Sequence, residues 1–483
     1  MLPRPNSKAV NRKERLDLPG SSPPRRPPAD RLAGFGESWS AVSLEWAQAA
    51  ARRCIQCPAE PCVRACPLGN DIPYALWHLE HGLVDDAARI FRRTSSMPDI
   101  CGRVCPQTEL CEGVCPYTKQ GRPPVPIGRL EAYAADWVAR EGIAVRTAAA
   151  RSTGRRIAIV GAGPAGITAA EALAGSGHAV TLFDAWPEAG GLLLYGIPRF
   201  KLSPEIVRRK TQHLSRLGIR CQFETKLGNG LSVDGLVDHG FDAILLAIGA
   251  GIGRPLEIPG SDLEGVNQAT PFLVWANTDP ALLPPGLRSR PEVGRRVAVI
   301  GGGDTAMDCV RTALRLGAED STVWYRRTEA EMPGNPRDRK LAIEEGARFE
   351  WLSAPVGLEA DGSGKVRAMR LVRMQLGDAD SSGRRRPSPI AGSEYTVETD
   401  TVVLALGYLP DADFVARIVG LDTEPDGRIR VDPLTGATSR AGIFAAGDNV
   451  LGPALVVDAV AHGIRAAEAI DSFVSAGGTV ATR

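Results

Sequence analysis

The chain has 483 residues, 43% hydrophobic and 23% charged, which is the composition of a globular protein with several domains. Its formal net charge of +1 argues against nucleic acid or an acidic membrane surface as the main partner. No apolar run approaches the roughly 18 residues that span a bilayer. Residues 1–30 are rich in Pro, Arg and Lys and lack the apolar core of a secretory signal, so they predict a disordered leader and a cytoplasmic location.

Residues 31–150 predict a small helical domain that carries most of the cysteines. Eight of the ten cysteines lie between Cys54 and Cys115. Apolar residues at helical spacing predict helices over Ser43–Arg53, Ile72–His81 and Val84–Arg93. Thiols clustered in a long chain without an export signal indicate metal binding rather than disulfides.

The eight cysteines form two groups. The first is Cys54-x2-Cys57-x4-Cys62-x3-Cys66, and the second holds Cys101, Cys105, Cys111 and Cys115. A [4Fe–4S] cluster is usually held by four thiolates, so eight cysteines can supply two clusters. Zinc is the alternative, because Cys54-x2-Cys57 alone can be half of a zinc site. Zinc has no redox chemistry, so the dinucleotide sites that the chain predicts from Arg155 onward, described next, favour iron–sulfur clusters.

From Arg155 onward strands alternate with helices, which predicts an α/β fold with parallel sheets. The first strand, Arg156–Val160, runs into a glycine-rich turn with the residues Gly161, Ala162, Gly163, Pro164, Ala165 and Gly166. The three glycines of such a turn permit the tight bend, the approach of a pyrophosphate and close helix packing. The next strand, Ala179–Phe183, ends at Asp184, whose carboxylate can bind ribose hydroxyls. This part of the chain therefore predicts a dinucleotide site.

A second strand and turn repeat this arrangement with a different ending. Arg296–Ile300 leads into the turn Gly301, Gly302, Gly303, Asp304, Thr305 and Ala306. The following strand, Thr322–Tyr325, ends at Arg326 and Arg327 instead of an acidic residue. Guanidinium groups bind a 2′-phosphate that a carboxylate would repel, so this site predicts NADPH. The alternative is a solvated basic pair at a strand end.

The first site resembles the FAD site of two-dinucleotide-binding flavoproteins. The resemblance rests on Gly442–Asp448, in which Gly447 and Asp448 are expected at the flavin's ribityl and phosphate portion, and on the helix predicted over Ala454–Ile470. The segments Ala247–Gly249 and Ala405-Leu406-Gly407 resemble the hinges between the FAD and NADPH domains of that superfamily. The resemblance implies an FAD domain of residues 151–285 and 400–483, with an NADPH domain of residues 286–399 inserted into it.

The whole chain after its leader resembles one family of electron-transfer proteins. It is similar to the small subunit of NADPH-dependent glutamate synthase, to the N-terminal half of dihydropyrimidine dehydrogenase and to the large subunit of NADH-dependent ferredoxin:NADP oxidoreductase. The matching segments are Arg53–Cys57, Cys66–Asp71, Cys101–Cys115, Ile127–Glu131, Gly190–Leu202 and Gly301–Asp308. The resemblance implies a helical iron–sulfur domain followed by two Rossmann-like domains.

The family resemblance also implies a set of site residues. One cluster would be held by Cys54, Cys57, Cys62 and Cys115, and the other by Cys66, Cys105 and Cys111. Glu131 is the implied fourth ligand of the second cluster, with Cys101 as the alternative. Gly190, Gly191, Leu192 and Lys201 would lie near the flavin, although a conformational loop with a surface lysine is the alternative for this segment.

The implied activity is electron transfer from NADPH through FAD and two [4Fe–4S] clusters to a partner subunit. Hydride transfer needs stacking, orientation and exclusion of water, so no catalytic side chain is predicted. The partner implied is a glutamate synthase large subunit, or another electron-accepting subunit. The alternatives are an NAD(P)H:ferredoxin oxidoreductase, including a bifurcating one, a dihydropyrimidine dehydrogenase-type reductase subunit, and a scaffold without activity.

Overall fold

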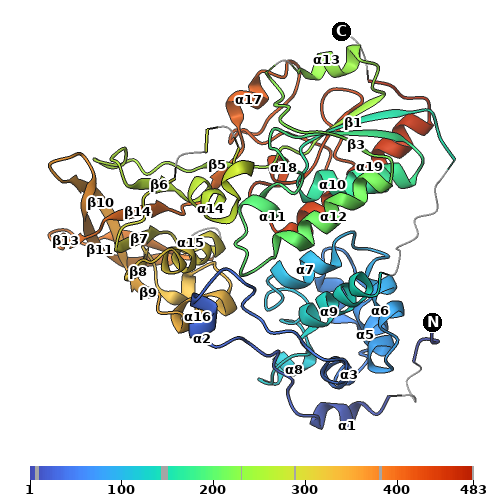
Figure 1. The fold of residues 1–483 in the computed structure, drawn as a ribbon, viewed down its shortest axis with the longest axis horizontal. Coiled ribbons are helices and arrows are strands. Elements are labelled where there is room, and N and C mark those ends of the chain that lie inside the picture. Colours follow the sequence, from blue (N-terminus) through green and yellow to red (C-terminus); the bar gives the residue numbers. More distant parts are fainter. Residues whose placement is uncertain are drawn as a thin grey trace.

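A computed structural model describes residues 1–5, 10–142, 151–229, 231–284, 286–287, 290–379 and 383–480. It contains an N-terminal helical domain and two α/β domains, as Figure 1 shows in blue, in green with red, and in yellow with orange. Residues 143–150, at the predicted end of the cysteine domain, lie outside the described part of the chain.

The N-terminal domain consists of short helices, four of which pack against α9. Its helices are α1 (Arg12–Asp17), α2 (Pro28–Leu32), α3 (Leu44–Arg52), α4 (Pro61–Ala65), α5 (Ile72–Glu80), α6 (Val84–Phe91), α7 (Pro98–Val104), α8 (Pro116–Lys119) and α9 (Ile127–Arg140). The three helices predicted from apolar spacing correspond to α3, α5 and α6. Helix α9 packs against α3, α5, α6 and α7, with Leu76, Phe91 and Leu130 in the core. The Ser43 side chain accepts from the Trp46 N–H and so caps the start of α3.

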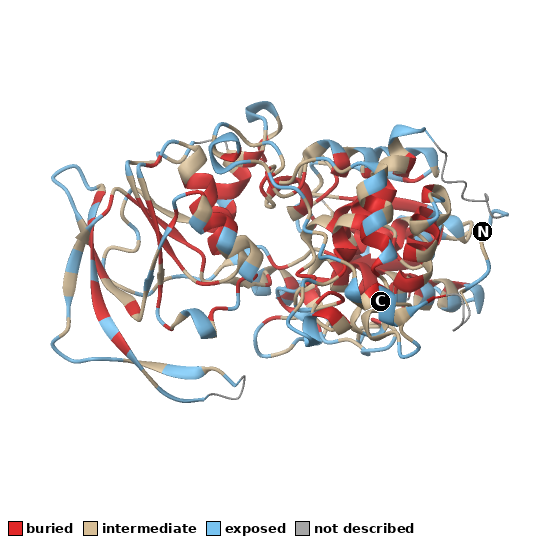
Figure 2. Ribbon diagram, turned by 90° about the horizontal axis from the view of Figure 1, so that it is seen from below, coloured by how far each residue is buried: buried red, intermediate tan, exposed pale blue. Residues whose placement is uncertain are grey.

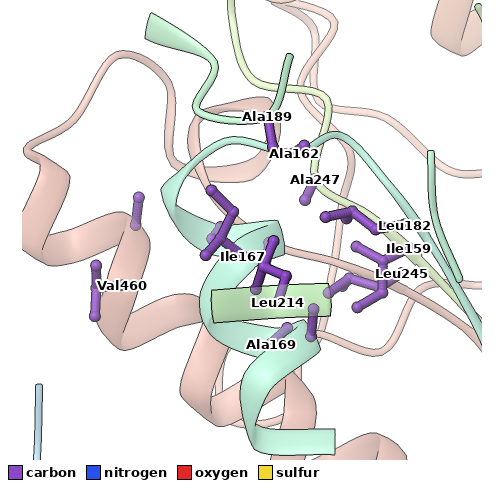
Figure 3. Close-up of a cluster of buried hydrophobic side chains, with 14 of the residues drawn as sticks. Ile159, Ala162, Ile167, Ala169, Leu182, Ala189, Leu214, Leu245, Ala247 and Val460 are labelled. Carbon is purple, nitrogen blue, oxygen red and sulfur yellow. The ribbon is translucent and has the colours of Figure 1, made fainter. Parts of the chain in front are cut away.

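The first α/β domain has a parallel sheet in the order β16-β4-β1-β2-β3. Its strands are β1 (Arg156–Val160), β2 (Ala179–Phe183), β3 (Arg220–Gln222), β4 (Ala243–Leu246) and β16 (Ile443–Ala445). Its helices are α10 (Pro164–Gly175), α11 (Leu192–Tyr195), α12 (Pro204–Arg216), α13 (Val233–Asp238), α17 (Ala412–Ala416), α18 (Asp448–Leu451) and α19 (Val456–Ser475). Helices α10 and α19 pack together beside the sheet, where Ile159, Leu182 and Leu245 are buried (Figure 3).

The second α/β domain has a parallel sheet in the order β6-β14-β7-β8-β9. Its strands are β6 (Val266–Gln268), β7 (Arg296–Ile300), β8 (Asp320–Tyr325), β9 (Arg348–Trp351) and β14 (Thr401–Leu404), and an antiparallel layer adds β10 (Ser353–Ala360), β11 (Val366–Ala379), β12 (Arg385–Pro389) and β13 (Tyr395–Glu398). Its helices are α14 (Ala269–Asn277), α15 (Asp304–Arg315), α16 (Pro336–Glu344) and the 3-10 turns η1 (Pro280–Leu282) and η2 (Glu329–Glu331). Buried residues, red in Figure 2, follow the central strands and helices of both α/β domains.

The second α/β domain is larger than the sequence predicts. Strand β14 pairs with β6 on one side and β7 on the other, so residues near 266 and 401 belong to the second sheet. The short strands β5 (Ile252–Gly253) and β15 (Tyr408–Leu409) pair with each other and mark where the chain enters and leaves this domain. The insertion therefore extends from about residue 252 to 409, not from 286 to 399, because β6 and β14 pair within the second sheet.

The predicted disordered leader is also corrected for the residues that the structure describes. Helix α1 lies beside α3 and α5 (Figure 1), and the Arg15 side chain, 7% exposed, forms an ion pair with Glu80. Further along, Arg25 pairs with Glu344 of the second α/β domain, and Arg31, just past the predicted leader, is 1% exposed and pairs with Glu344 and Glu345. The basic composition that suggested disorder instead supplies partners for carboxylates of the folded domains.

The helical domain and the first α/β domain share one core. Met97, Ile100 and Cys101 on or next to α7 belong to the same buried cluster as Ile159 and Leu245 of the sheet. Helix α7 also packs against α12 and α19. The cysteine region is thus held directly against the domain that carries the first glycine-rich turn.

Candidate functional site

The turn between β1 and α10 needs glycine at two positions and is open at a third. Gly161 has φ +106°, and a Cβ there would lie 2.2 Å from the Ala247 carbonyl oxygen. A Cβ on Gly166 would lie 1.9 Å from the Gly161 carbonyl oxygen. No described heavy atom lies within 4 Å of a Cβ built on Gly163, which precedes the first residue of α10. The open space in front of a helix N-terminus fits the phosphates of a dinucleotide.

Asp184 is fixed at the end of β2 by the neighbouring backbone. One carboxylate oxygen accepts from the Ala162 N–H at 2.6 Å and the other from the Trp186 N–H at 2.8 Å. Burial raises the pKa of this carboxyl, although the two N–H groups oppose the effect. Each oxygen retains a second lone pair, so the oriented carboxylate can still accept from ribose hydroxyls.

Two further segments line the cavity that this glycine-rich turn also lines. Gly191 and Leu192 at the start of α11 line it, whereas Gly190, with φ +137°, lies behind them against the Leu194 and Val207 side chains. Gly447 and Asp448 line it from the end of β16 and the start of α18. Burial raises the pKa of Asp448 to about 7, opposed by the Ala454 backbone N–H.

The turn between β7 and α15 repeats this geometry. Gly301 has φ +142°, and a Cβ there would lie 2.2 Å from the Ala405 carbonyl oxygen, while Gly303 faces open space. Gly302, Asp304 and Thr305 complete the lining of the cavity. The Asp304 carboxylate is not directed only at the cavity, because it accepts from the Asn335 N–H at 2.7 Å.

The two predicted arginines after β8 have different environments. Arg326 is exposed and lines the cavity. Arg327 also lines it but is 6% exposed, and its Nε donates to the Arg385 carbonyl oxygen at 2.8 Å. The structure adds Arg384, which reaches the same cavity from the antiparallel layer and was not predicted. Its only sequence signal is the run of three arginines Arg384–Arg386.

One cavity of about 1410 Å³ joins the two glycine-rich turns. The predicted hinge segments lie between them, so Ala247–Gly249 and Ala405, Leu406 and Gly407 all line it. Thr270, Asp308 and Tyr408, which were not predicted, line the same region. The cavity also reaches Val104, the residue before Cys105. It is therefore large enough for two dinucleotides end to end, with the cysteine domain at one wall.

Lys201 lines the cavity but its ammonium group already has two partners. Its Nζ lies 3.0 Å from the Asp308 carboxylate and 2.8 Å from the Asp338 carboxylate. These carboxylates hold the pKa of Lys201 above its usual range although burial acts in the opposite direction. The lysine thus links the loop after α11 to helices α15 and α16 across the two α/β domains. The structure favours neither a flavin contact nor a simple surface lysine.

The first predicted set of thiols surrounds one small apolar pocket. Cys54, Cys57, Cys62 and Cys115 line it together with Leu76 and Tyr117. Burial raises the pKa of Cys54 and Cys57 and raises that of Cys62 to about 12. Thiolates in such a place need a cationic centre to stabilise them, so the donor set fits an iron–sulfur cluster.

The second predicted set also consists of buried and half-buried thiols. Burial and neighbouring groups raise the pKa of Cys66, Cys105 and Cys111, and the charge of Glu131 contributes to the shift of all three. Glu131 is 7% exposed, accepts from the Asn70 amide at 3.1 Å, and burial raises its pKa to about 8. Cys101 is 2% exposed and hydrogen-bonds with Cys105. Both candidate fourth ligands are thus adjacent to the set. Among the described residues, no three His, Cys, Asp or Glu side chains converge closely enough to hold a single metal ion.

Comparisons with known proteins give the family. Residues 31–143 match the model for dihydropyrimidine dehydrogenase domain II with its 4Fe-4S cluster, and residues 155–463 match that for pyridine nucleotide-disulphide oxidoreductases. The glutamate synthase [NADPH] small chain of Escherichia coli is 39% identical over 468 residues, which cover 95% of this chain and 98% of that one. The chain belongs to the family of glutamate synthase small chains. Family membership confirms the fold class, the oxidoreductase class and the predicted cofactors FAD, NADPH and [4Fe–4S].

Two other proteins are similar to the chain, one in sequence and one in fold. The putative oxidoreductase AegA of Escherichia coli is 39% identical over 463 residues, which cover 92% of this chain and 69% of AegA. The structure of Mycobacterium tuberculosis FprA in complex with NADPH is 20% identical, covers 67% of this chain and 85% of FprA, and has a TM-score of 0.56. The likeness to FprA concerns the fold alone. In the described residues, no helix is long and apolar enough to cross a membrane.

Proposed function

We propose that this chain is the NADPH-oxidising subunit of a glutamate synthase and passes electrons to a separate large chain that forms L-glutamate. The observation that carries the proposal is the single cavity, which joins both nucleotide-binding turns and reaches Val104 beside Cys105. Similarity over 98% of the Escherichia coli small chain supports the same assignment. The proposal includes two [4Fe–4S] clusters with the ligand sets given below, and a cytoplasmic location.

The chain's own residues bind and orient the two nucleotides. The turn at Gly161–Gly166 and the Asp184 carboxylate would hold FAD, and the turn at Gly301–Thr305 would hold the pyrophosphate of NADPH, with Arg326 and Arg327 at its 2′-phosphate. The hinge segments between the turns form the wall that excludes water. When bound, FAD would supply the conversion of a hydride from NADPH into single electrons, and [4Fe–4S] clusters would supply one-electron transfer toward the acceptor.

The proposed ligands follow the two sets of buried thiols. Cys54, Cys57, Cys62 and Cys115 would hold one cluster. Cys66, Cys105 and Cys111 would hold the other with Glu131, and Cys101 is the alternative fourth ligand. The proximity of Glu131 to all three thiols supports its assignment.

The test is reconstitution with a glutamate synthase large chain. We expect NADPH oxidation that depends on both glutamine and 2-oxoglutarate and yields two glutamates per NADPH. A preparation with full flavin and iron content that reduces artificial acceptors, yet forms no glutamate with a competent large chain, would contradict the proposed partner.

A second candidate is an electron-transfer subunit that serves another acceptor, such as ferredoxin. It is favoured by the 39% identity to AegA, a putative oxidoreductase of greater length than this chain. NADPH-dependent reduction of ferredoxin at a rate well above that with the large chain would support this candidate over the first.

A further inference from the structure

Helix α1 lies over the loop that carries the first two cysteines. The Arg15 guanidinium donates to the carbonyl oxygens of Arg52 and Cys54 at 2.9 and 2.8 Å. Arg12 donates to the carbonyl oxygens of Ile55 and Gln56, both at 3.3 Å. The two arginines of one short helix thus bind four backbone carbonyl groups between residues 52 and 56.

The loop needs such support because its backbone is strained. Gln56 has φ +49°, a conformation that residues other than glycine rarely adopt. The Gln56 side chain donates to the Pro73 carbonyl oxygen at 2.7 Å, and the Gln56 carbonyl oxygen accepts from Arg12. The contacts from α1 and α5 therefore hold Cys54 and Cys57 on either side of a left-handed residue.

Helix α1 is also held by two residues that follow Cys115 in the chain, Tyr117 and Arg122. The buried Tyr117 hydroxyl donates to the carbonyl oxygens of Arg15 and Arg53 at 2.5 and 2.9 Å. Arg122 donates to the carbonyl oxygens of Leu16 and Leu18. Tyr117 also lines the pocket formed by the first set of thiols, so α1 and this pocket share a wall.

The two arginines of α1 differ in charge balance. Arg15 is neutralised by Glu80, to which it donates two hydrogen bonds of 2.8 Å. Among the residues that the structure describes, Arg12 has no carboxylate within ion-pair distance. The Arg12 guanidinium donates to the carbonyl oxygens of Ile55 and Gln56, the two residues between Cys54 and Cys57. Arg12 thus brings a positive charge to the loop that joins these two thiols.

We propose that α1 belongs to the cluster site formed by the first set of thiols. Arg12 and Arg15 fix the Cys54–Cys57 loop, and the charge of Arg12 makes the bound cluster easier to reduce. The inference rests on the proposed function, because it needs a cluster at Cys54, Cys57, Cys62 and Cys115. Reduction adds one negative charge to such a centre, and a nearby cation stabilises the reduced form. Arg12 is therefore a positioning residue for electron transfer.

The experiment is an anaerobic redox titration of the holoenzyme followed by electron paramagnetic resonance. Arg12→Gln removes the charge but keeps a hydrogen-bond donor, Arg12→Lys keeps the charge, and Lys13→Gln removes the charge of the exposed neighbour on α1. We expect Arg12→Gln to lower the midpoint potential of one cluster and to leave the flavin and the other cluster unchanged. Arg12→Lys and Lys13→Gln should retain the wild-type value. The shift should also shrink as salt is added, because part of the site is open to solvent.

The outcomes separate this inference from the proposed function. Wild-type protein without cluster signals would overturn both. Wild-type protein with two clusters and NADPH-reducible flavin, but with no shift in Arg12→Gln or an equal shift in Lys13→Gln, would overturn the inference alone. If Arg12→Gln loses one cluster, the Arg12→Lys variant distinguishes the explanations. A wild-type midpoint potential of that cluster in Arg12→Lys supports the role of charge, whereas loss of the same cluster in Arg12→Lys overturns the inference.

Discussion

Single side chains in the cavity differ in what they can give to a nucleotide. Arg326 and Arg327 are adjacent in sequence, yet Arg326 is exposed and Arg327 is buried against the Arg385 carbonyl. A guanidinium that already satisfies one backbone group has fewer N–H donors left for a phosphate. We therefore expect Arg326 to contribute more to the binding of a 2′-phosphate than Arg327.

The first prediction concerns Arg326→Ala. Loss of charge-assisted hydrogen bonds to the 2′-phosphate should weaken NADPH binding by about 1.5–3 kcal/mol, while NADH binding should change little. The ratio of the two dissociation constants, measured by flavin reduction in stopped flow, reports the change. Arg367→Ala is the matched control, because Arg367 is exposed on β11 of the same domain and does not line the cavity. An unchanged ratio in Arg326→Ala would place the 2′-phosphate elsewhere.

A second prediction follows from the raised pKa of Asp448. Burial shifts this pKa from 3.8 to about 7, so the folded protein disfavours the ionised carboxylate. The resulting loss of stability is absent below about pH 4, grows as the pH rises toward 7, and is constant above that value. In flavin-depleted protein, Asp448→Asn should therefore raise the Tm more at pH 8 than at pH 5. Equal Tm differences at the two pH values would show that Asp448 ionises without cost.

At the scale of elements, the two glycine-rich turns combine two separate requirements. Gly161 and Gly301 take left-handed backbone conformations and press against the carbonyl groups of Ala247 and Ala405. Gly163 and Gly303 face open space at the helix N-termini. The first pair is thus needed for folding of the turn, and the second pair for access of a ligand.

The third prediction separates these requirements with two alanine variants. Gly161→Ala forces a Cβ to within 2.2 Å of a backbone oxygen at φ +106°, so it should destabilise the protein by about 2–5 kcal/mol even without FAD. Gly163→Ala meets no neighbour and should change stability by less than about 1 kcal/mol. Its methyl group nevertheless enters the space expected for the pyrophosphate, so FAD binding should weaken. Thermal unfolding of flavin-depleted protein and flavin titration measure the two effects, and tight FAD binding by Gly163→Ala would argue against this site.

Elements that depend on local pattern were predictable from the sequence, and those that depend on distant pairing were not. Strands β1 and β7 with their glycine-rich turns, and helices α3, α5 and α6, follow from apolar spacing and turn chemistry. Strand β6 has only three residues, and its place beside β14 depends on a partner more than 130 residues away. Arg384 reaches the cavity, and Arg12 the cysteine loop, only through tertiary contacts. Composition alone could not show that the basic residues near the N-terminus have partners in folded domains.

At the scale of the whole molecule, the order of the domains in space implies a direction for electrons. The cavity lies between the two α/β domains, and one wall reaches Val104 of the helical domain. Helix α7 shares its core with the first α/β domain, whereas the pocket of Cys54, Cys57, Cys62 and Cys115 is built on the separate core of the helical domain. We therefore expect electrons to enter at the cavity and to pass first to the cluster held by Cys66, Cys105 and Cys111. They would then leave through the cluster held by Cys54, Cys57, Cys62 and Cys115.

The last prediction tests this direction with Cys54→Ala. Wild-type protein should contain about eight irons and eight acid-labile sulfides, and the variant about four of each. NADPH should still bleach the flavin in stopped flow, and acceptors that take electrons directly from FAD should still be reduced, because the cavity is intact. Activity with the partner chain should collapse, because its electrons need the missing centre. Asp448→Ala is the control, since weaker flavin retention should depress both activities together. A folded, flavin-replete Cys54→Ala protein with full partner activity would show that electrons bypass this centre.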